Sequence, residues 1–445
     1  MDSDFLLHSG TARELYGEVA ALPLIDWHNH LSVADLREDR QYRSVTELWI
    51  DADPYKHRAM RICGVPEKFI TGDADDFDKF AAWSRTLPRL AGNPLYCWSI
   101  MELERVFGIT ERLDDRSAAS IYRRINEMLS GKDFSVRAIL RRFSVRIAAP
   151  CVGLSEDLSA FDKIPGVVPS FRGDDAAALR LPPEWAPRDM AELRALLRER
   201  CEQLHRCGCR FADHALDGDF VYAADDGGDP ARFSAWRRGE ATPDDLLHLR
   251  SEVLRIAAGE YARCGWVLQL HVGALRRTSD RLRALSGPFG GYAAIAAPCD
   301  MTALVALLND LERAEEGMPR IILYALNPAD HVPFAALGGA FTGDGVRGQL
   351  RLGPAWWYCD HRTGIRDCLN CTAAFGVLSL FPGMTTDSRT PLSFVRHEYF
   401  RRVMCDFLAE KAGCGELPRD GEILRDLAYR LSYGNAWEFF REGEE

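Results

Sequence analysis

The stretch Leu24-Ile25-Asp26-Trp27-His28-Asn29-His30-Leu31 joins a short apolar run to two histidines spaced two residues apart. Side chains alternate between the two faces of an extended strand, so His28 and His30 point to the same side. Two imidazoles at the end of a buried strand form a chelating pair for a metal ion. The alternative is a pair of core or loop histidines, and the choice between the two depends on the rest of the chain.

Eight short apolar runs alternate with longer segments of helical periodicity, a pattern typical of a parallel α/β fold. The runs span 22–31, 145–151, 166–172, 209–216, 267–273, 321–327, 349–357 and 380–390. Eight units favour a closed barrel over an open sheet, so we predict a (β/α)8 TIM-type barrel. Residues 32–144 carry helical patterning and predict a mostly helical insertion after strand 1, over the active-site mouth. We expect residues 1–445 to form a single elaborated catalytic domain.

The composition of the 445 residues, 47% hydrophobic and 27% charged, is that of an ordinary globular protein. The chain shows neither a leader peptide nor an apolar run long enough to span a membrane, so we expect a cytoplasmic location. Its 13 cysteines are scattered, which predicts reduced thiols that mostly fill the core. A net charge of −11 argues against nucleic-acid or anionic-membrane partners, and an anionic substrate would need local arginines.

A metal ion bound by the two histidines also needs an anionic ligand, and Asp387 is the best candidate. It lies at the end of the eighth run, which neighbours the first strand in a closed barrel. We therefore predict that His28, His30 and Asp387 share one divalent ion. The alternative for Asp387 is the N-cap of a helix that begins near Ser393.

Other polar and aromatic residues at strand ends are candidates for binding a substrate. His271 closes the fifth run and is either a third metal ligand or a substrate donor. Guanidinium groups at strand ends suit bidentate capture of a carboxylate, although any one of them could instead be a surface group. The remaining candidates are Arg172, Arg276, Arg389, Asp213, Trp356 and Trp357, of which the tryptophans could equally be core. His397-Glu398 lacks the second histidine of the zinc-protease pattern and is predicted to be a helix surface pair.

Taken together, these motifs resemble the uronate isomerases of the amidohydrolase superfamily. The resemblance rests on the motifs of 24–31, 269–276 and 386–389, and it continues through Tyr55-Lys56 and 396–402 over nearly the whole chain. It implies a barrel with one divalent metal ion, usually zinc, held by His28, His30 and Asp387. The implied reaction converts D-glucuronate to D-fructuronate, or D-galacturonate to D-tagaturonate, so the implied partner is a small anionic sugar.

By the same resemblance, Tyr55 and Asp387 take part in proton transfer, with Arg389 beside them. The resemblance also implies that the substrate is surrounded by Arg172, Asp213, His271, Arg276 and Trp356 or Trp357. Two departures stand out: Pro54 replaces the histidine that usually precedes the tyrosine, and residues 148–153 replace a Thr- and Asp-rich end of strand 2. A mononuclear metal hydrolase of an acidic sugar derivative and a non-catalytic sugar-acid binder stay open as alternatives, as does assembly into a homo-oligomer.

Overall fold

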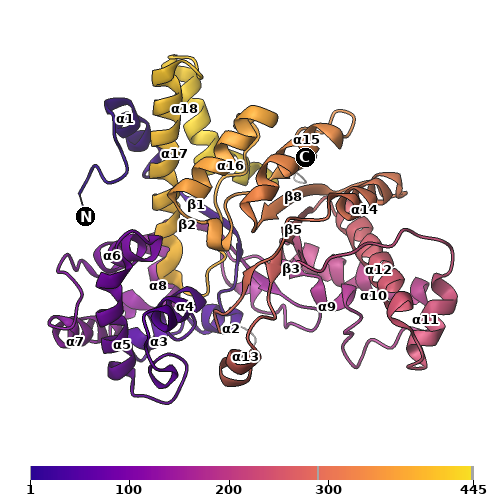
Figure 1. Ribbon diagram of the computed structural model, residues 1–445, viewed down its shortest axis with the longest axis horizontal. Helices are drawn as coiled ribbons and strands as arrows, with labels where there is room; N and C mark the ends of the chain where they lie inside the picture. The colour runs from indigo at the N-terminus through magenta and orange to yellow at the C-terminus, as the bar shows by residue number, and fades with distance from the viewer. Residues whose placement is uncertain (1, 288–289, 442–445) are drawn as a thin grey trace.

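Seven parallel strands form one curled sheet in the computed structural model, which describes residues 2–287 and 290–441 (Figure 1). Their order in the sheet is β1-β2-β3-β4-β5-β8-β9, so each strand pairs with the next one along the chain, apart from a short hairpin. The strands are β1 Leu24–Asn29, β2 Val145–Val152, β3 Ser170–Arg172, β4 Phe211–Leu216, β5 Val267–Val272, β8 Arg320–Ala325 and β9 Leu350–Leu352. Each falls within or beside one of the first seven predicted runs. The hairpin β6 Ala274–Leu275 and β7 Ala294–Ile295 is antiparallel.

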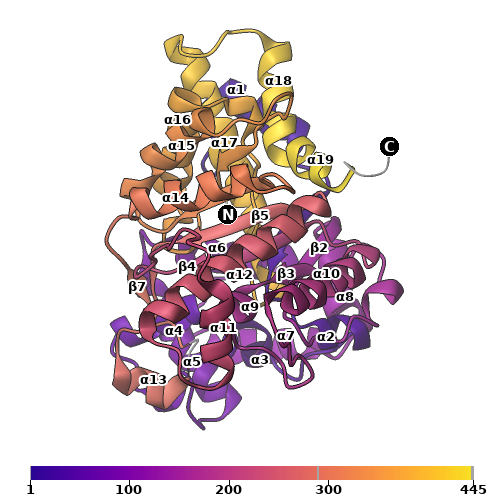
Figure 2. The same ribbon diagram turned by 90° about the vertical axis from the view of Figure 1, so that its right-hand side faces the viewer.

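The strands are buried along most of their length because helices cover the outside of the sheet. Neighbouring outer helices contact one another: α10 with α12, α12 with α14, α15 with α16, and α16 with α17. Figure 2 shows α10 and α12 across one side of the sheet. These and the remaining helices after β3 are α9 Asp174–Ala177, α10 Met190–Arg206, α11 Asp229–Arg237, α12 Pro243–Arg263, α13 Asp280–Ser286, α14 Met301–Arg313, α15 His331–Ala340, α16 Arg362–Phe375, α17 Val395–Cys414, α18 Gly421–Tyr429 and α19 Asn435–Arg441. This alternation is the architecture of a (β/α)8 barrel.

The eighth apolar run is not a regular strand, and that part of the prediction is wrong. Residues Leu378–Leu380 form a 3-10 turn, and the chain then runs in an irregular path to Ser388. Pro382 has no N–H to donate, and Gly383 and Asp387 have positive φ values of 101° and 50°, so a regular ladder cannot form.

The irregular segment still occupies the eighth position beside β1. The Asp387 N–H donates to the His28 carbonyl at 3.0 Å, and the His30 N–H donates to the Ser388 carbonyl at 2.7 Å. Just before these two bonds along both segments, the His28 N–H donates to the Thr385 hydroxyl at 2.9 Å. A threonine side chain thus takes the place of a backbone group in closing the barrel.

The chain between β1 and β2 is helical. Its helices are α2 Val33–Glu38, α3 Val45–Trp49, α4 Pro54–Ile62, α5 Asp76–Thr86, α6 Pro94–Phe107, α7 Ala118–Leu129 and α8 Val136–Arg142, and α1 Gly10–Val19 precedes β1. Helix α6 packs on α17, and α1 packs on both α17 and α18, so α17 connects the N-terminal helix with the helices between β1 and β2. Within residues 2–287 and 290–441, no helix has the length and apolar character to cross a bilayer.

Candidate metal centre and active site

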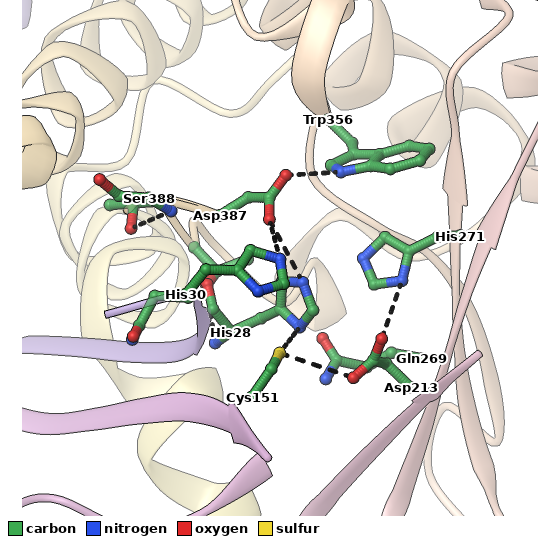
Figure 3. A network of polar contacts seen from close by, with 12 residues as sticks. His28, His30, Cys151, Asp213, Gln269, His271, Trp356, Asp387 and Ser388 are labelled. Atoms are coloured by element: carbon green, nitrogen blue, oxygen red, sulfur yellow. Dashed lines mark hydrogen bonds and ion pairs between the residues drawn. The ribbon is translucent and has the colours of Figure 1, made fainter. Parts of the chain in front are cut away.

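The carboxyl end of β1 and the irregular segment bring His28, His30 and Asp387 together (Figure 3). Asp387 Oδ1 lies 3.0 Å from His30 Nε2 and 3.5 Å from His28 Nε2. The other carboxylate oxygen, Oδ2, accepts a hydrogen bond from Trp356 Nε1 at 3.1 Å. One imidazole nitrogen from β1 and one from the residue just after it, His30, therefore converge on one oxygen contributed from the other side of the barrel seam.

A buried carboxylate below this cluster holds the two chain segments in register. Asp26 Oδ1 accepts hydrogen bonds from the Thr385 hydroxyl and the Thr386 N–H, both at 2.7 Å, and Oδ2 accepts from the Thr386 hydroxyl at 2.6 Å. His397 Nε2 lies 3.6 Å from the same carboxylate. Because these bonds come from residues next to Asp387, Asp26 fixes where the Asp387 carboxylate emerges.

The electrostatics of the cluster act differently on its three groups. Burial lowers the pKa of His28, but Cys151 and the hydrogen bond with Asp387 outweigh burial and raise this pKa well above its usual range, so His28 carries a proton that a metal ion would have to displace. Burial alone would raise the pKa of Asp387, but hydrogen bonds from His28 and His30 lower it well below its usual range. Burial lowers the pKa of His30 to about 4, although Asp387 acts in the opposite direction. Near neutral pH the carboxylate is therefore ionised and the His30 imidazole is neutral.

The donor set fits a divalent metal ion. Imidazole nitrogens and a carboxylate are the ligands that zinc and similar ions take in open, catalytic sites. Beside them, His28, Asp213 and His271 offer ligand atoms that all lie within 4.8 Å of one another. Asp213 Oδ2 and His271 Nε2 are buried and have no hydrogen-bond partner within the described chain. Unsatisfied buried polar atoms are uncommon, so this cluster is suited to a cation or a polar ligand.

These residues open onto a cavity of about 1560 Å³. Among the residues that line it are ten predicted from the sequence: His28, His30, Tyr55, Arg172, His271, Arg276, Trp356, Trp357, Asp387 and Arg389. Asp213 lies behind this wall, fully buried. The cavity is therefore lined by residues from most of the length of the chain. It lies at the carboxyl ends of the strands, where the active sites of barrel enzymes are found.

Two arginines of the cavity, Arg172 and Arg276, are held by carboxylates next to them. Arg172 Nη2 lies 2.9 Å from Asp174 Oδ2, and Arg172 Nη1 lies 3.5 Å from Asp213 Oδ2. Arg276 Nε donates to Asp217 at 2.9 Å. About a third of each side chain is exposed, 31% for Arg172 and 33% for Arg276, so each guanidinium keeps a face toward the cavity. Positions fixed in this way suit recognition of an anionic group.

Tyr55 reaches the cavity from the first turn of α4. The helix begins with Pro54 at its first position, after Asp53 caps it by accepting the Tyr55 N–H at 2.9 Å. The Tyr55 hydroxyl is buried without a hydrogen-bond partner in the described chain. Burial, opposed by Arg396 and reinforced by Asp387, raises the pKa of Tyr55, so the hydroxyl stays protonated and can donate. Pro54 also lines the cavity but offers no polar side chain there.

Two interpretations of single residues are corrected by the structure. His397 is not a surface residue: it is buried, only 4% exposed, and faces Asp26. Its neighbour Glu398 pairs with Arg105 and Arg402. Asp387 is not a helix cap, because Thr390 caps the following turn by accepting the Leu392 N–H, and the Asp387 carboxylate faces the histidines instead.

Sequence reasoning missed the roles of Asp26 and Cys151. Asp26 stood within the motif that opens the barrel, but its partners are more than 350 residues away along the chain. Cys151 was assigned to the core with the other cysteines, and the structure places its sulfur beside His28. The position of Cys151 at the last residues of a predicted strand was the one signal that pointed to the site.

A (β/α)8 barrel with histidines and a carboxylate gathered at the carboxyl ends of its strands is typical of metal-binding barrel enzymes. Within that class, a family model described as glucuronate isomerase matches residues 1–440. The chain belongs to the glucuronate isomerase family, and the uronate isomerase predicted from the sequence is confirmed at this level.

Relatives along the full length agree with this assignment. The uronate isomerase of Oceanobacillus iheyensis is 37% identical, with 100% of this chain and 98% of that protein covered. The uronate isomerase of Caldanaerobacter subterraneus is 36% identical, with 99% and 98% covered. Among solved structures, uronate isomerase from Thermotoga maritima superposes with a TM-score of 0.90 at 27% identity, covering 99% of both chains. These comparisons confirm the predicted barrel class.

Proposed function

We propose that this protein interconverts an open-chain hexuronate aldose and its 2-keto isomer, acting on D-glucuronate, D-galacturonate or both. One observation supports this beyond family membership: the ionised carboxylate of Asp387 lines the same cavity as a protonated tyrosine and the three arginines predicted from the sequence, Arg172, Arg276 and Arg389. This is the set of groups that moving a proton between neighbouring carbons of an anionic sugar requires.

The reaction needs one proton acceptor and one stabiliser of the developing negative charge. A base removes the proton from C2, the electron pair enters the C1–C2 bond, and negative charge develops on the former carbonyl oxygen at C1. The proton then returns to C1, while the hydroxyl proton of C2 is transferred to the oxygen of C1, so that C2 becomes the carbonyl carbon. We assign the proton transfer at carbon to Asp387. Tyr55 donates its hydroxyl proton to the oxygen of C1 and takes up the hydroxyl proton of C2, so the transfer between the two oxygens passes through the tyrosine, and Arg389 stabilises the enediolate.

The substrate carboxylate is assigned to the arginines at the strand ends. Arg172 and Arg276 are anchored by Asp174 and Asp217, so that little side-chain freedom is lost when an anion binds. Trp356 and Trp357 provide an apolar wall, and His271 and Asp213 offer polar atoms beside it. We further propose that 1–445 acts as one elaborated barrel whose helices in 32–144 supply the Tyr55 side of the mouth.

His28, His30 and Asp387 would hold one divalent metal ion, for which zinc suits the two imidazoles and one carboxylate. When bound, such an ion would polarise or orient substrate oxygens. The runner-up function is a hydrolase of an acidic sugar ester, lactone or amide at the same metal centre, where a water molecule would be the nucleophile.

The experiment compares metal-loaded protein on three substrates: D-glucuronate, D-galacturonate and a uronolactone. An isomerase forms a 2-keto acid from at least one free uronate and leaves the lactone at its spontaneous rate of hydrolysis. Accelerated lactone hydrolysis without ketose formation would favour the hydrolase. Binding of a uronate with neither reaction would reduce the protein to a sugar-acid binder and refute the proposal.

A further inference from the structure

Strand β2 ends on a thiol that lies between two groups of the candidate metal centre. Cys151 Sγ is 3.4 Å from His28 Nδ1 and 3.6 Å from Asp213 Oδ1 (Figure 3). Both distances are within hydrogen-bond range for sulfur, whose larger radius lengthens such contacts. Cys151 therefore bridges β1 and β4 at the level of the site, through two side chains that are themselves buried.

The donors and acceptors of the Asp213 carboxylate, the Cys151 thiol and the His28 imidazole determine the direction of the hydrogen bonds between them. An ionised carboxylate only accepts, so the thiol S–H is directed to Asp213. The sulfur lone pair then remains to accept the N–H of His28 Nδ1. A histidine that carries its proton on Nδ1 keeps the lone pair of Nε2, and this lone pair faces Asp387 Oδ1 at 3.5 Å.

A lone pair aimed at a carboxylate oxygen is repulsive unless a proton or a metal ion lies between them, and a bound metal ion would take that place. The surroundings support a cation independently of the cysteine. Asp213 Oδ2 and His271 Nε2 belong to the same cluster, are 0% and 4% exposed as residues, and have no hydrogen-bond partner within the described chain. The thiol thus lies at the back of a site in which His271 Nε2 has no hydrogen-bond partner within the described chain, and Asp213 Oδ2 has the Arg172 guanidinium at 3.5 Å.

We propose that Cys151 is a positioning residue for the metal centre: its thiol passes a hydrogen bond from His28 to Asp213 and so holds His28 Nε2 ready as a ligand. Groups that orient a ligating histidine through its second nitrogen are usually carboxylates, carbonyls or water, and here a cysteine takes that place. The inference rests on the proposed metal centre and not on the identity of the sugar.

The test measures zinc affinity of the full-length protein after metal removal, by competition with a chromophoric chelator. Loss of an orienting group typically weakens metal binding by about 10- to 100-fold, and this is the loss expected for Cys151→Ala. Cys151→Ser keeps a group that both donates and accepts, so its affinity is expected to stay within about threefold of the wild type. Cys371→Ala, a partly buried cysteine of α16, serves as the matched control and is expected to bind zinc normally.

A second measurement separates positioning from direct ligation. Cobalt-substituted wild-type protein is expected to show no sulfur-to-cobalt charge-transfer band in the near ultraviolet, and this reading does not depend on whether Cys151→Ala folds. Three results would overturn the proposal. Cys151→Ala could bind zinc as tightly as the wild type, Cys151→Ser could lose zinc affinity, or the cobalt-substituted protein could show a charge-transfer band. Because zinc affinity is measured without a sugar, a Cys151-dependent affinity in a protein that isomerises no uronate would refute only the proposed function.

Discussion

At the scale of residues, Asp387 is placed to serve two purposes with one carboxylate. Oδ1 faces the two histidines of β1, while Oδ2 is oriented by Trp356. The left-handed backbone at this residue, with φ at 50°, turns the side chain toward the cavity, and aspartate tolerates this conformation better than most residues. The low pKa of the carboxyl group keeps it ionised at neutral pH.

The variant Asp387→Asn tests this assignment. An amide can neither accept the proton from C2 nor neutralise a metal ion, so kcat is expected to fall by about 10²- to 10⁴-fold, the usual contribution of a positioned acid or base. Steady-state kinetics give the loss, and circular dichroism checks that the fold is retained. Asp219→Asn, an exposed carboxylate at the outer part of the same cavity, is the control and keeps wild-type turnover. Near-normal kcat in Asp387→Asn would refute the role.

At the scale of elements, the barrel is closed by side chains as much as by backbone. Asp26 accepts three hydrogen bonds from Thr385 and Thr386 and thereby ties the irregular segment to β1. These two pieces carry all three candidate ligands. The integrity of the seam and the metal site therefore depend on the same buried carboxylate.

Removing the Asp26 carboxylate should lower both the free energy of unfolding and the metal occupancy. Asp26→Ala leaves buried donors of Thr385 and Thr386 without an acceptor, and breaking such a buried charged network destabilises by about 3–5 kcal/mol. Chemical denaturation measures the change in the free energy of unfolding, and metal analysis of the purified protein is expected to show reduced occupancy. Asp78→Ala, an exposed position on α5, controls for loss of a carboxylate and should change stability little. Unchanged metal content in a folded Asp26→Ala protein would contradict this account of the seam.

Helix α4 contains a buried histidine, His57, from which we predict a loss of stability in acid. His57 is 5% exposed, neither ring nitrogen has a hydrogen-bond partner in the described chain, and burial lowers its pKa to about 4. The unfolded chain therefore binds more protons than the native protein between about pH 6.5 and 4. Stability is fully present above this window and is lost as the pH falls through it.

The variant His57→Phe removes this titration. For a pKa lowered from 6.5 to about 4, the native state loses about 2 kcal/mol between pH 7 and pH 5, and His57→Phe should lack that part of the loss. Denaturation curves at pH 7 and pH 5 for both proteins measure the difference. Identical pH dependence in wild type and variant would show that folding does not lower the pKa of His57, and it would contradict this account.

Seven of the strands could be predicted because a buried parallel strand is marked by its own apolar residues, as in 267–273. The eighth could not, because Pro382 and the positive φ values of Gly383 and Asp387 change the path without changing the apolar pattern. Candidate site residues were recognisable where they ended a strand, as His28 and His271 do. Cys151 and His397 were misjudged because their roles depend on partners in other elements, His28 and Asp26, that local sequence does not reveal.

At the scale of the whole molecule, the proposed metal site joins the first strand to the last barrel segment. His28 and Asp387 are far apart in the chain, so the site exists only in the folded barrel. A ligand that binds the native state alone stabilises the entire fold by mass action.

Metal addition is therefore expected to raise the melting temperature of metal-depleted protein. At a free zinc concentration of about 100 times the dissociation constant, the stabilisation is about 2.7 kcal/mol. Differential scanning calorimetry across a zinc titration measures the shift. The double variant His28→Asn/His30→Asn should show no shift, whereas His361→Asn, outside the cavity, should respond like the wild type. An equal shift in the double variant would place the bound metal elsewhere.

The central claim, an aldose–ketose isomerase of hexuronates built on this cavity, is tested most directly by following C1 of the sugar. Metal-loaded protein is incubated with D-glucuronate and D-galacturonate labelled with carbon-13 at C1, and the carbon spectrum is recorded over time. Isomerisation converts the labelled anomeric carbon into the CH2OH carbon of the 2-keto product, so its signal leaves the anomeric region of the spectrum, and this change is the expected result for at least one of the two sugars. A label that stays at the anomeric position with both sugars, in protein shown to be fully loaded with metal, would contradict the account.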